Sequence, residues 1–198
     1  MKEISFPVKF TFKISTLSND FVARDSRGAT LAYVRQKMFK LKESVNVYGN
    51  EDRHQLLYTI KANKWLDFSA AYAITDAAGT SVGKVARKGW RSIWKAEYHI
   101  INPQDQVQYK VRERSIWTRM ADNVVGDIPV LGFFTGYLFH PVYEVRDTAG
   151  NVVMELKKQP SFFGRQFTLE QIEDLPDEDD TRVVLGLMMM VLLERQRG

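Results

Sequence analysis

The sequence predicts an all-β protein: a closed barrel of about twelve antiparallel strands that encloses a hydrophobic C-terminal α-helix. Two observations lead to this class. One hairpin pattern occurs three times along the chain, and the chain ends in an apolar run, Val183 to Leu193, although its mean hydropathy is only −0.30. A helix that is apolar on every face must be covered on every face. In a chain made almost wholly of strands, a sheet closed into a barrel is the structure that can surround such a helix.

Each copy of the hairpin pattern is a short apolar strand, an Asp-x-x-Gly turn and a second strand that ends in Lys or Arg. The aspartate side chain can accept hydrogen bonds from the nearby backbone, and glycine supplies the positive φ that closes the turn. The recurrence predicts three related β-hairpins. Their turn residues are Asp25/Gly28, Asp76/Gly79 and Asp147/Gly150.

A basic and aromatic connector follows each hairpin, with the sequences KMFK, RKGWRSIW and KKQPSFFGR. Another strand comes after each connector. In the first two units this strand enters a second turn, near Asn50 and near Asn102, and returns as QLLYTIKAN and VQYKVRERS. A further strand is expected at Val8–Ile14. The Gly-, Pro- and aromatic-rich region 115–142 matches no pattern of helix or strand.

Charged residues on both sides of the apolar tail are typical of helix ends. The carboxylates of Asp177–Asp180 suit the positive end of the helix dipole, and Asp180 or Thr181 can cap the helix. Eleven residues rise about 17 Å at about 1.5 Å per residue, whereas a bilayer core of about 30 Å needs about 20 residues. We therefore expect a buried helix and no transmembrane span, and a membrane tail anchor is the less favoured alternative.

No low-complexity linker interrupts the chain. We therefore expect a single domain over residues 1–198, with residues 178–195 as its central buried helix. Gly186 would allow this helix to approach the barrel wall closely.

Composition and charge narrow the class of protein. The chain has no cysteine, which excludes disulfides, thiolate catalysis and cysteine-ligated metals. Its N-terminus lacks the apolar core of a signal peptide, so we expect a cytoplasmic protein, at most peripheral to the membrane. Residues 170–180 carry seven acidic and no basic side chains, so the rest of the chain holds 28 basic against 17 acidic groups. Such a surface favours anionic partners, lipid headgroups or nucleic acid.

The strongest candidate binding site is the connector after the second hairpin, GKVARKGWRSIWKAEY. Cations interleaved with tryptophan suit a membrane interface, and they also suit single-stranded nucleic acid. In the alternative reading, the tryptophans pack in the barrel and the cations only solvate the loop. A weaker patch lies in the matching connector of the first unit. The candidate residues for an anionic headgroup are Lys84, Arg87, Lys88, Trp90, Arg91, Trp94, Lys95, Lys37, Lys40 and Lys42.

Patterns for enzyme or metal sites are weaker. The GTSVG motif around Ser81 matches a nucleophile elbow, but the residues after it predict a returning strand where a helix is required. The three histidines, His54, His99 and His140, have no metal-ligand spacing. A calcium loop that started at Asp177, in the acidic run before the tail, would have Met188 at the position where such a loop needs a glutamate. We expect no catalytic residue, no metal and no cofactor.

The order and spacing of these pieces resembles the LURP-one-related family, in particular its bacterial relatives, within the tubby C-terminal fold that is also related to the phospholipid scramblases. The resemblance covers nearly the whole chain. It rests on the Asp-x-x-Gly hairpins, the segment QPSFFGRQF at 159–167 and the closing VVLGLMMMVLLERQRG. It implies a plugged barrel and, from tubby domains, phosphoinositide binding through basic residues on the barrel wall. No residue-level lipid motif matches, and the missing cysteines and calcium loop argue against scramblase activity.

We therefore expect a non-enzymatic barrel that binds an anionic partner, above all phosphoinositide or other anionic lipid headgroups at a membrane surface. Lys and Arg would pair with phosphates, tryptophan would insert shallowly and the apolar helix would stay inside. The alternative is a protein-interaction or structural scaffold without lipid affinity. Nucleic acid is not the expected partner.

Overall fold

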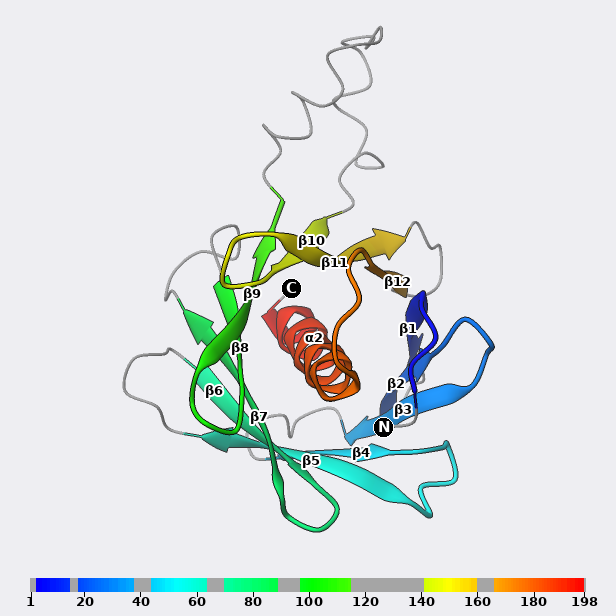
Figure 1. Cartoon of the computed structure of the whole chain (residues 1–198). Coiled ribbons are helices and arrows are strands. Elements are labelled where there is room, and N and C mark those ends of the chain that lie inside the picture. The colour runs from blue at the N-terminus through cyan, green and yellow to red at the C-terminus, as the bar shows by residue number, and fades with distance from the viewer. Residues whose placement is uncertain are drawn as a thin grey trace, which may run out of the picture.

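The computed structural model describes residues 3–14, 18–37, 44–63, 70–88, 97–114, 141–159 and 166–197. Within these ranges twelve strands form a closed barrel around one helix (Figure 1), which confirms the predicted fold class. The elements are β1 (Val8–Ile14), β2 (Ser18–Arg24), β3 (Thr30–Lys37), β4 (Ser44–Tyr48), β5 (Leu56–Asn63), β6 (Ala70–Asp76), β7 (Ser81–Lys88), β8 (Glu97–Ile101), β9 (Val107–Glu113), β10 (Val142–Arg146), β11 (Val152–Gln159), β12 (Gln166–Gln171) and α2 (Asp177–Arg197).

Each strand pairs antiparallel with its neighbours in the chain, and the barrel closes where the first strand meets the last. In this closing pair, Val8 lies opposite Leu169 and Thr11 lies opposite Gln166. Closure removes the unpaired strand edges that an open sheet would expose. The region 115–142 of the sequence analysis falls on residues 115–140, which lie outside the described residues, and on the start of β10.

The three predicted hairpins share one turn geometry. In the first, the N–H of Gly28 donates to the carbonyl oxygen of Asp25 at 3.0 Å, and the N–H of Ala29 donates to the Asp25 carboxylate at 2.8 Å. The φ of Gly28 is 80°, a value that favours glycine. The same bonds recur at Asp76/Gly79 and Asp147/Gly150. A one-residue register shift precedes each turn, so each hairpin combines a turn with a β-bulge.

The two turns predicted near asparagine are also confirmed. In the turn between β8 and β9, Asn102 has the role that aspartate has in the other hairpins. Its side-chain oxygen accepts a hydrogen bond from the N–H of Gln106 at 2.8 Å. Asp105 then takes the positive φ, 63°, that glycine has elsewhere. In the turn after Asn50, Arg53 has a φ of 62°.

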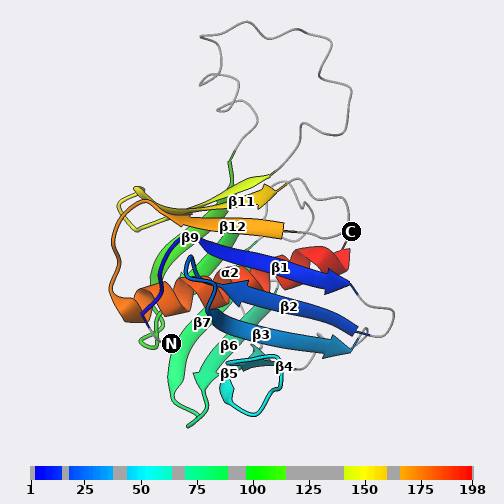
Figure 2. The same cartoon turned by 90° about the vertical axis from the view of Figure 1, so that its right-hand side faces the viewer.

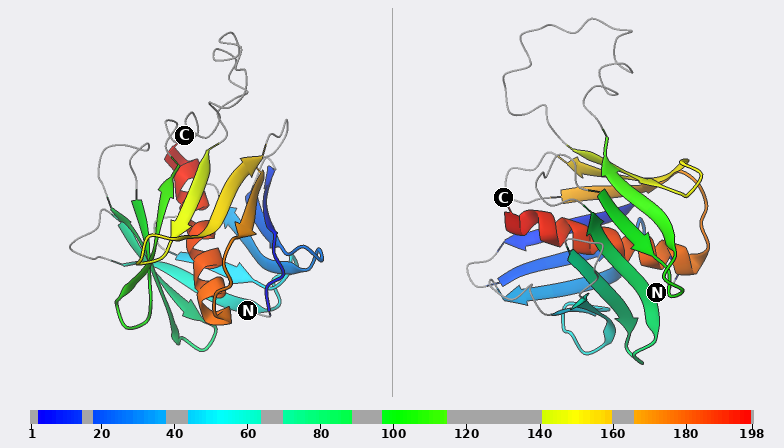
Figure 3. Two further views of the ribbon diagram at one scale, coloured as in Figure 1. Left: turned by 45° about the horizontal axis from the view of Figure 1, so that its top comes forward. Right: turned by 90° about the vertical axis from the view of Figure 1, so that its left-hand side faces the viewer.

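The helix α2 runs through the barrel, with strands on every side (Figures 1 and 3). Every residue of Asp180–Leu193 is buried. A Cβ atom added to Gly186 would lie 3.2 Å from Cγ1 of Ile100 and 3.9 Å from Cβ of Val85, so the expected close approach to the wall is confirmed. Among the described residues, no helix combines the length and apolar character that crossing a membrane requires.

The start of α2 differs from the prediction. The helix begins at Asp177, and the carbonyl oxygen of Pro176 accepts hydrogen bonds from the N–H groups of Asp179 and Asp180 at 2.8 and 3.0 Å. The expectation that Asp180 or Thr181 caps the helix is therefore wrong, because both residues already lie within it. The acidic side chains do occupy the first turn, where the helix dipole favours negative charge.

The two ends of the barrel are unlike. The five tight turns, between β2 and β3, β4 and β5, β6 and β7, β8 and β9, and β10 and β11, lie at the end where α2 begins; we call this the turn end. The odd-numbered strands all finish at the opposite end, towards which β1 and β3 point in Figure 2 and where α2 ends. We call this the connector end, because the strands that border the connectors of the sequence meet it. The connectors themselves lie outside the described residues.

Candidate anion-binding surface

The structure describes only some of the candidate cations. Lys37 is the last residue of β3 and Lys88 is the last residue of β7. Both strands finish at the connector end. Within β7 the structure also places Lys84 and Arg87. The other candidates lie outside the described residues: Trp90, Arg91, Trp94, Lys95, Lys40 and Lys42.

Arg87 lies inside the barrel and not on its surface. Successive side chains of a strand point to opposite faces, and Val85, two residues earlier, packs against α2. Arg87 therefore points inward, opposite Tyr98 of β8, and only 3% of its surface is exposed. The sequence analysis groups Arg87 with the surface cations, and the structure does not agree with this grouping. A headgroup at the membrane surface would not reach the buried guanidinium of Arg87.

Lys84 lies on the outer face of β7, and an acidic residue of the turn end neutralises it. Its ammonium lies 2.5 Å from the carboxylate of Asp105, in the turn between β8 and β9. This contact holds the charge of Lys84 towards the turn end, away from the connector end. Lys84 is therefore poorly placed to bind an anion beside the connectors.

Lys88 is exposed and, within the described part of the chain, forms no ion pair. The residue opposite it on β8 is Glu97. One carboxylate oxygen of Glu97 accepts a hydrogen bond from His99 and the other binds Arg112. Because both oxygens of this opposing carboxylate are occupied, the Lys88 ammonium keeps its charge available to an external anion.

The Glu97 cluster is buried although it lies on the outer face of the barrel. Glu97 and His99 are 8% and 6% exposed. Burial alone would raise the pKa of the Glu97 carboxyl, but the hydrogen bonds from His99 and Arg112 outweigh it and hold this pKa below its usual value. The charged carboxylate is thus the stable form. We interpret the cluster as structural, because a firmly paired carboxylate does not exchange protons near neutral pH.

An outer belt of charged residues continues from Lys88 around the wall. Its members lie opposite one another on neighbouring strands: Lys88, Glu97, Arg112, Glu144, Glu155 and Glu170. The glutamates of the belt bind cations from adjacent rows. Arg146 lies 2.6 Å from Glu144, and Lys157 lies 3.2 Å from Glu155 and 2.5 Å from Glu170. Arg112, Arg146 and Lys157 are therefore neutralised, in contrast to Lys88.

The turn end carries the acidic start of α2. Asp179 accepts hydrogen bonds from the hydroxyl of Tyr109 at 2.7 Å and from Arg182 at 2.5 Å. Arg182 also donates to the carbonyl oxygen of Val82. Burial, together with the nearby carboxylates of the acidic run, raises the pKa of Asp180 to about 6. The helix entrance thus holds negative charge, which makes the turn end unsuited to an anionic surface.

The catalytic motif of the sequence analysis has no matching geometry in the described residues. Ser81 is the first residue of β7, so a strand follows the serine where a nucleophile elbow needs a helix. His99 lies opposite Ala86, five residues further along β7, and its Nε2 bonds to Glu97. Within the described ranges, no three acidic or histidine side chains form a group that could hold a metal ion.

A groove on the outer wall was not anticipated from the sequence. It lies over β1, β11 and β12, has a cavity volume of about 390 Å³ and is lined by polar side chains together with Phe167. Its lining includes Lys9 and Thr168, which lie opposite each other on the first and last strands. The alternation of polar and apolar residues in both strands indicates outward side chains, and a closed barrel makes the two strands neighbours, but the sequence does not show their register.

Comparison with known proteins identifies the class of barrel. A family model described as LURP-one-related matches residues 30–128. The chain belongs to the LURP-one-related family. The resemblance found in the sequence is thus confirmed, and this LURP-one-related barrel has the closed strands and inner helix of the tubby-like fold.

Other comparisons add little to the family assignment. The LURP-one-related chain is similar to a protein of Arabidopsis thaliana solved by X-ray crystallography, with 11% sequence identity and a TM-score of 0.46, over 95% of this chain and 93% of that chain. No curated protein matches the chain.

Proposed function

We propose that this LURP-one-related protein is a non-enzymatic barrel that binds anionic lipid headgroups, phosphoinositides among them, through its connector end. The observation that carries the proposal is the opposite character of the two ends. The strands that border the basic and aromatic connectors in the sequence meet one end of the barrel, and the acidic start of α2 lies at the other.

The tryptophans of the chain follow this division. All four lie outside the described residues, in stretches of sequence between strands whose described ends meet the connector end: Trp65, Trp90, Trp94 and Trp117. The five tight turns at the turn end contain no Trp, Tyr or Phe. Tryptophan favours the headgroup region of a bilayer because its ring is apolar and its N–H can donate a hydrogen bond. The division therefore supports a connector end that faces a membrane.

Charge supports the same orientation. An anionic membrane attracts exposed cations within about a Debye length of its surface and repels carboxylates. Lys88 is exposed beside the connector end, whereas the carboxylates of Asp177–Asp180 lie at the turn end. Such a protein would approach the membrane with the connector end first. Its inner helix α2 would not insert, since the barrel already buries it.

The proposal is tested by co-sedimentation of the protein with vesicles of phosphatidylcholine alone, or with phosphatidylserine or phosphatidylinositol phosphate added, at low and high salt. We expect binding to the anionic vesicles only, and weaker binding at high salt. A basic residue near the surface contributes about 1 kcal/mol, so Lys88→Ala should weaken binding about fivefold. Adding Arg91→Ala and Lys95→Ala should weaken it further.

Lys110→Ala is the matched control, because Lys110 is also exposed and, in the described residues, forms no ion pair, but it lies on β9 away from the strand ends. This variant loses the same charge and should bind like the wild type. Equal losses for Lys88→Ala and Lys110→Ala would mean that net charge, and not the connector end, attracts the vesicle. Failure to bind any vesicle would favour a scaffold without lipid affinity.

A further inference from the structure

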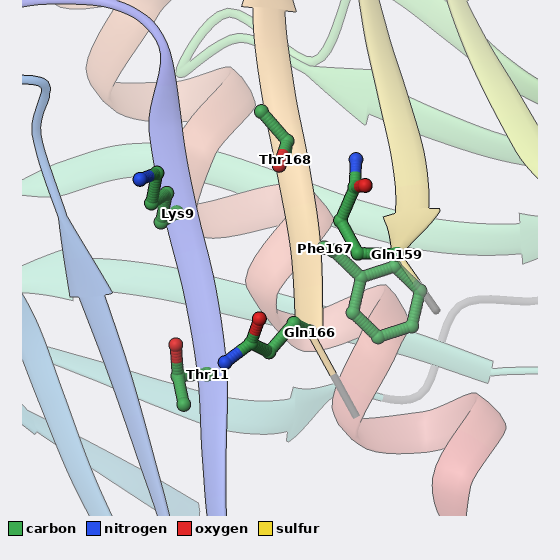
Figure 4. A pocket seen from close by; sticks show the side chains of 6 residues that line it. All are labelled: Lys9, Thr11, Gln159, Gln166, Phe167 and Thr168. Atoms are coloured by element: carbon green, nitrogen blue, oxygen red, sulfur yellow. The ribbon is translucent and has the colours of Figure 1, made fainter. Parts of the chain in front are cut away.

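The outer groove over β1, β11 and β12 has the features of a second, separate binding site. Figure 4 shows its lining: two residues from β1, three from β12 and one from the end of β11. They are Lys9, Thr11, Gln159, Gln166, Phe167 and Thr168. The Gln166 side chain extends from β12 towards β1, so the groove crosses the seam where the barrel closes (Figure 4).

Strand register explains why polar groups gather here. Thr168 lies opposite Lys9 on one side and Lys157 on the other, and Gln166 lies opposite Thr11 and Gln159. All of these side chains point outward, because Phe167 between them lies opposite the core residue Phe10 and is only 8% exposed. Hydroxyl and amide groups from three adjacent strands therefore share one patch of the wall.

Lys9 differs from the cations around it. Lys13 and Arg24 both bind Glu51, at 2.6 and 3.0 Å, and Lys157 is held by Glu155 and Glu170. Lys9 is exposed and has no ion pair within the described residues. It is also the only charged residue among the six that line the groove.

The lining matches the chemistry of a phosphorylated polyol. An unpaired ammonium and neighbouring hydroxyl and amide donors are the groups that bind phosphate oxygens. A volume of about 390 Å³ exceeds the need of a bare phosphate ion and lies in the usual range of small-molecule sites. The two glutamines and two threonines both donate and accept hydrogen bonds, as the hydroxyl groups of a polyol require.

We propose that this groove binds a phosphate ester of a polyol, with Lys9 pairing the phosphate and the Thr and Gln side chains binding the hydroxyls. The ester could be a soluble metabolite or a lipid headgroup, since both present the same chemistry. The groove reaches the connector end at Gln159 and Gln166, but it does not include Lys88, because its residues lie on β1, β11 and β12 while Lys88 ends β7.

Titration of the ¹⁵N-labelled protein with myo-inositol 1-phosphate, monitored by NMR, tests this site. We expect the backbone amides of Lys9, Thr11, Gln166 and Thr168 to shift and saturate, and unphosphorylated inositol to bind at least tenfold more weakly. Lys9→Ala should weaken binding about tenfold, because a hydrogen-bonded charge pair is lost. Thr168→Val, which keeps the shape and removes the hydroxyl, should weaken it by a few fold.

Lys61→Ala is the matched control, since Lys61 is an exposed lysine of β5 that has no ion pair in the described residues and lies outside the groove. Vesicles containing phosphatidylinositol identify the source: Lys9-dependent binding indicates a lipid headgroup, and binding of the soluble ester alone indicates a metabolite. Lys88→Ala should leave the inositol phosphate affinity unchanged, which separates this site from the surface at Lys88. Equal effects of Lys9→Ala and Lys61→Ala, or equal binding of inositol and its phosphate, would overturn the proposal.

Discussion

Replacing Gly186 by alanine tests the contact between the inner helix and the barrel wall. In an open helix this change is stabilising by about 1 kcal/mol, because glycine is the weaker helix former. Here the added methyl would lie 3.2 and 3.3 Å from Cγ1 and Cδ1 of Ile100. Overpacking of a filled core costs about 1–3 kcal/mol. We therefore expect Gly186→Ala to lower the free energy of unfolding by about 1 kcal/mol, opposite in sign to the intrinsic preference.

A double-mutant cycle isolates this contact. Ile100→Ala removes both atoms that the new methyl would meet, and alone it should cost about 2–5 kcal/mol. In that background Gly186→Ala should become stabilising by about 1 kcal/mol, because the methyl fills part of the cavity and the helix preference is recovered. Urea unfolding followed by circular dichroism measures all four proteins. If Gly186→Ala stabilises the wild-type protein by the ordinary amount, the helix does not pack against β7 and β8 as described.

Three further changes test other parts of the fold. Gly83→Ala should lower the free energy of unfolding in urea by more than about 3 kcal/mol. Gly83 has a φ of 135°, and an added Cβ would collide with the carbonyl oxygen of Ile101. The control Gly79→Ala, with open space around the added Cβ, should cost only about 1 kcal/mol. Asp180 has a folded pKa of about 6, above the ordinary 3.8, so stability should fall as pH rises from about 4 to 6. Asp180→Asn should therefore be more stable at pH 8 by up to about 3 kcal/mol, with no difference below pH 4, measured by thermal unfolding. Truncation before Thr181 should unfold the barrel, and a folded, soluble product by circular dichroism would contradict the plugged barrel.

Local chemistry explains why the turns and the helix were predictable. An Asp-x-x-Gly turn needs only its own residues, since the aspartate side chain and the positive φ of glycine act within five positions. The apolar tail likewise shows its burial in its own sequence. The pair Glu97 and His99 was not predicted, although the sequence permits it, because residues two apart in a strand share a face. Its partner Arg112 follows from the register of the hairpin at Asn102.

The inward position of Arg87 was missed although the alternation of β7 indicates it, because Val85, two residues earlier, lies on the same face. A register shift between β6 and β7, where Thr75 lies opposite Ser81 and Ile74 opposite Gly83, inserts one residue before Val85. The shift exchanges the two faces only for the residues that precede it, and the sequence does not show where it falls. The groove at Lys9 depends on the register between the first and last strands, which no local pattern specifies.

The most direct test of the central claim asks which end of the barrel meets the membrane. Because the chain has no cysteine, a single introduced cysteine can carry an environment-sensitive fluorophore such as NBD. Asn63→Cys places it at the exposed end of β5 beside the connector end, and Thr148→Cys places it in an exposed turn at the opposite end. With anionic vesicles, we predict a blue shift and increased emission for the label at position 63 and no change at position 148. An equal response at both positions, or a response only at 148, would contradict the proposed orientation.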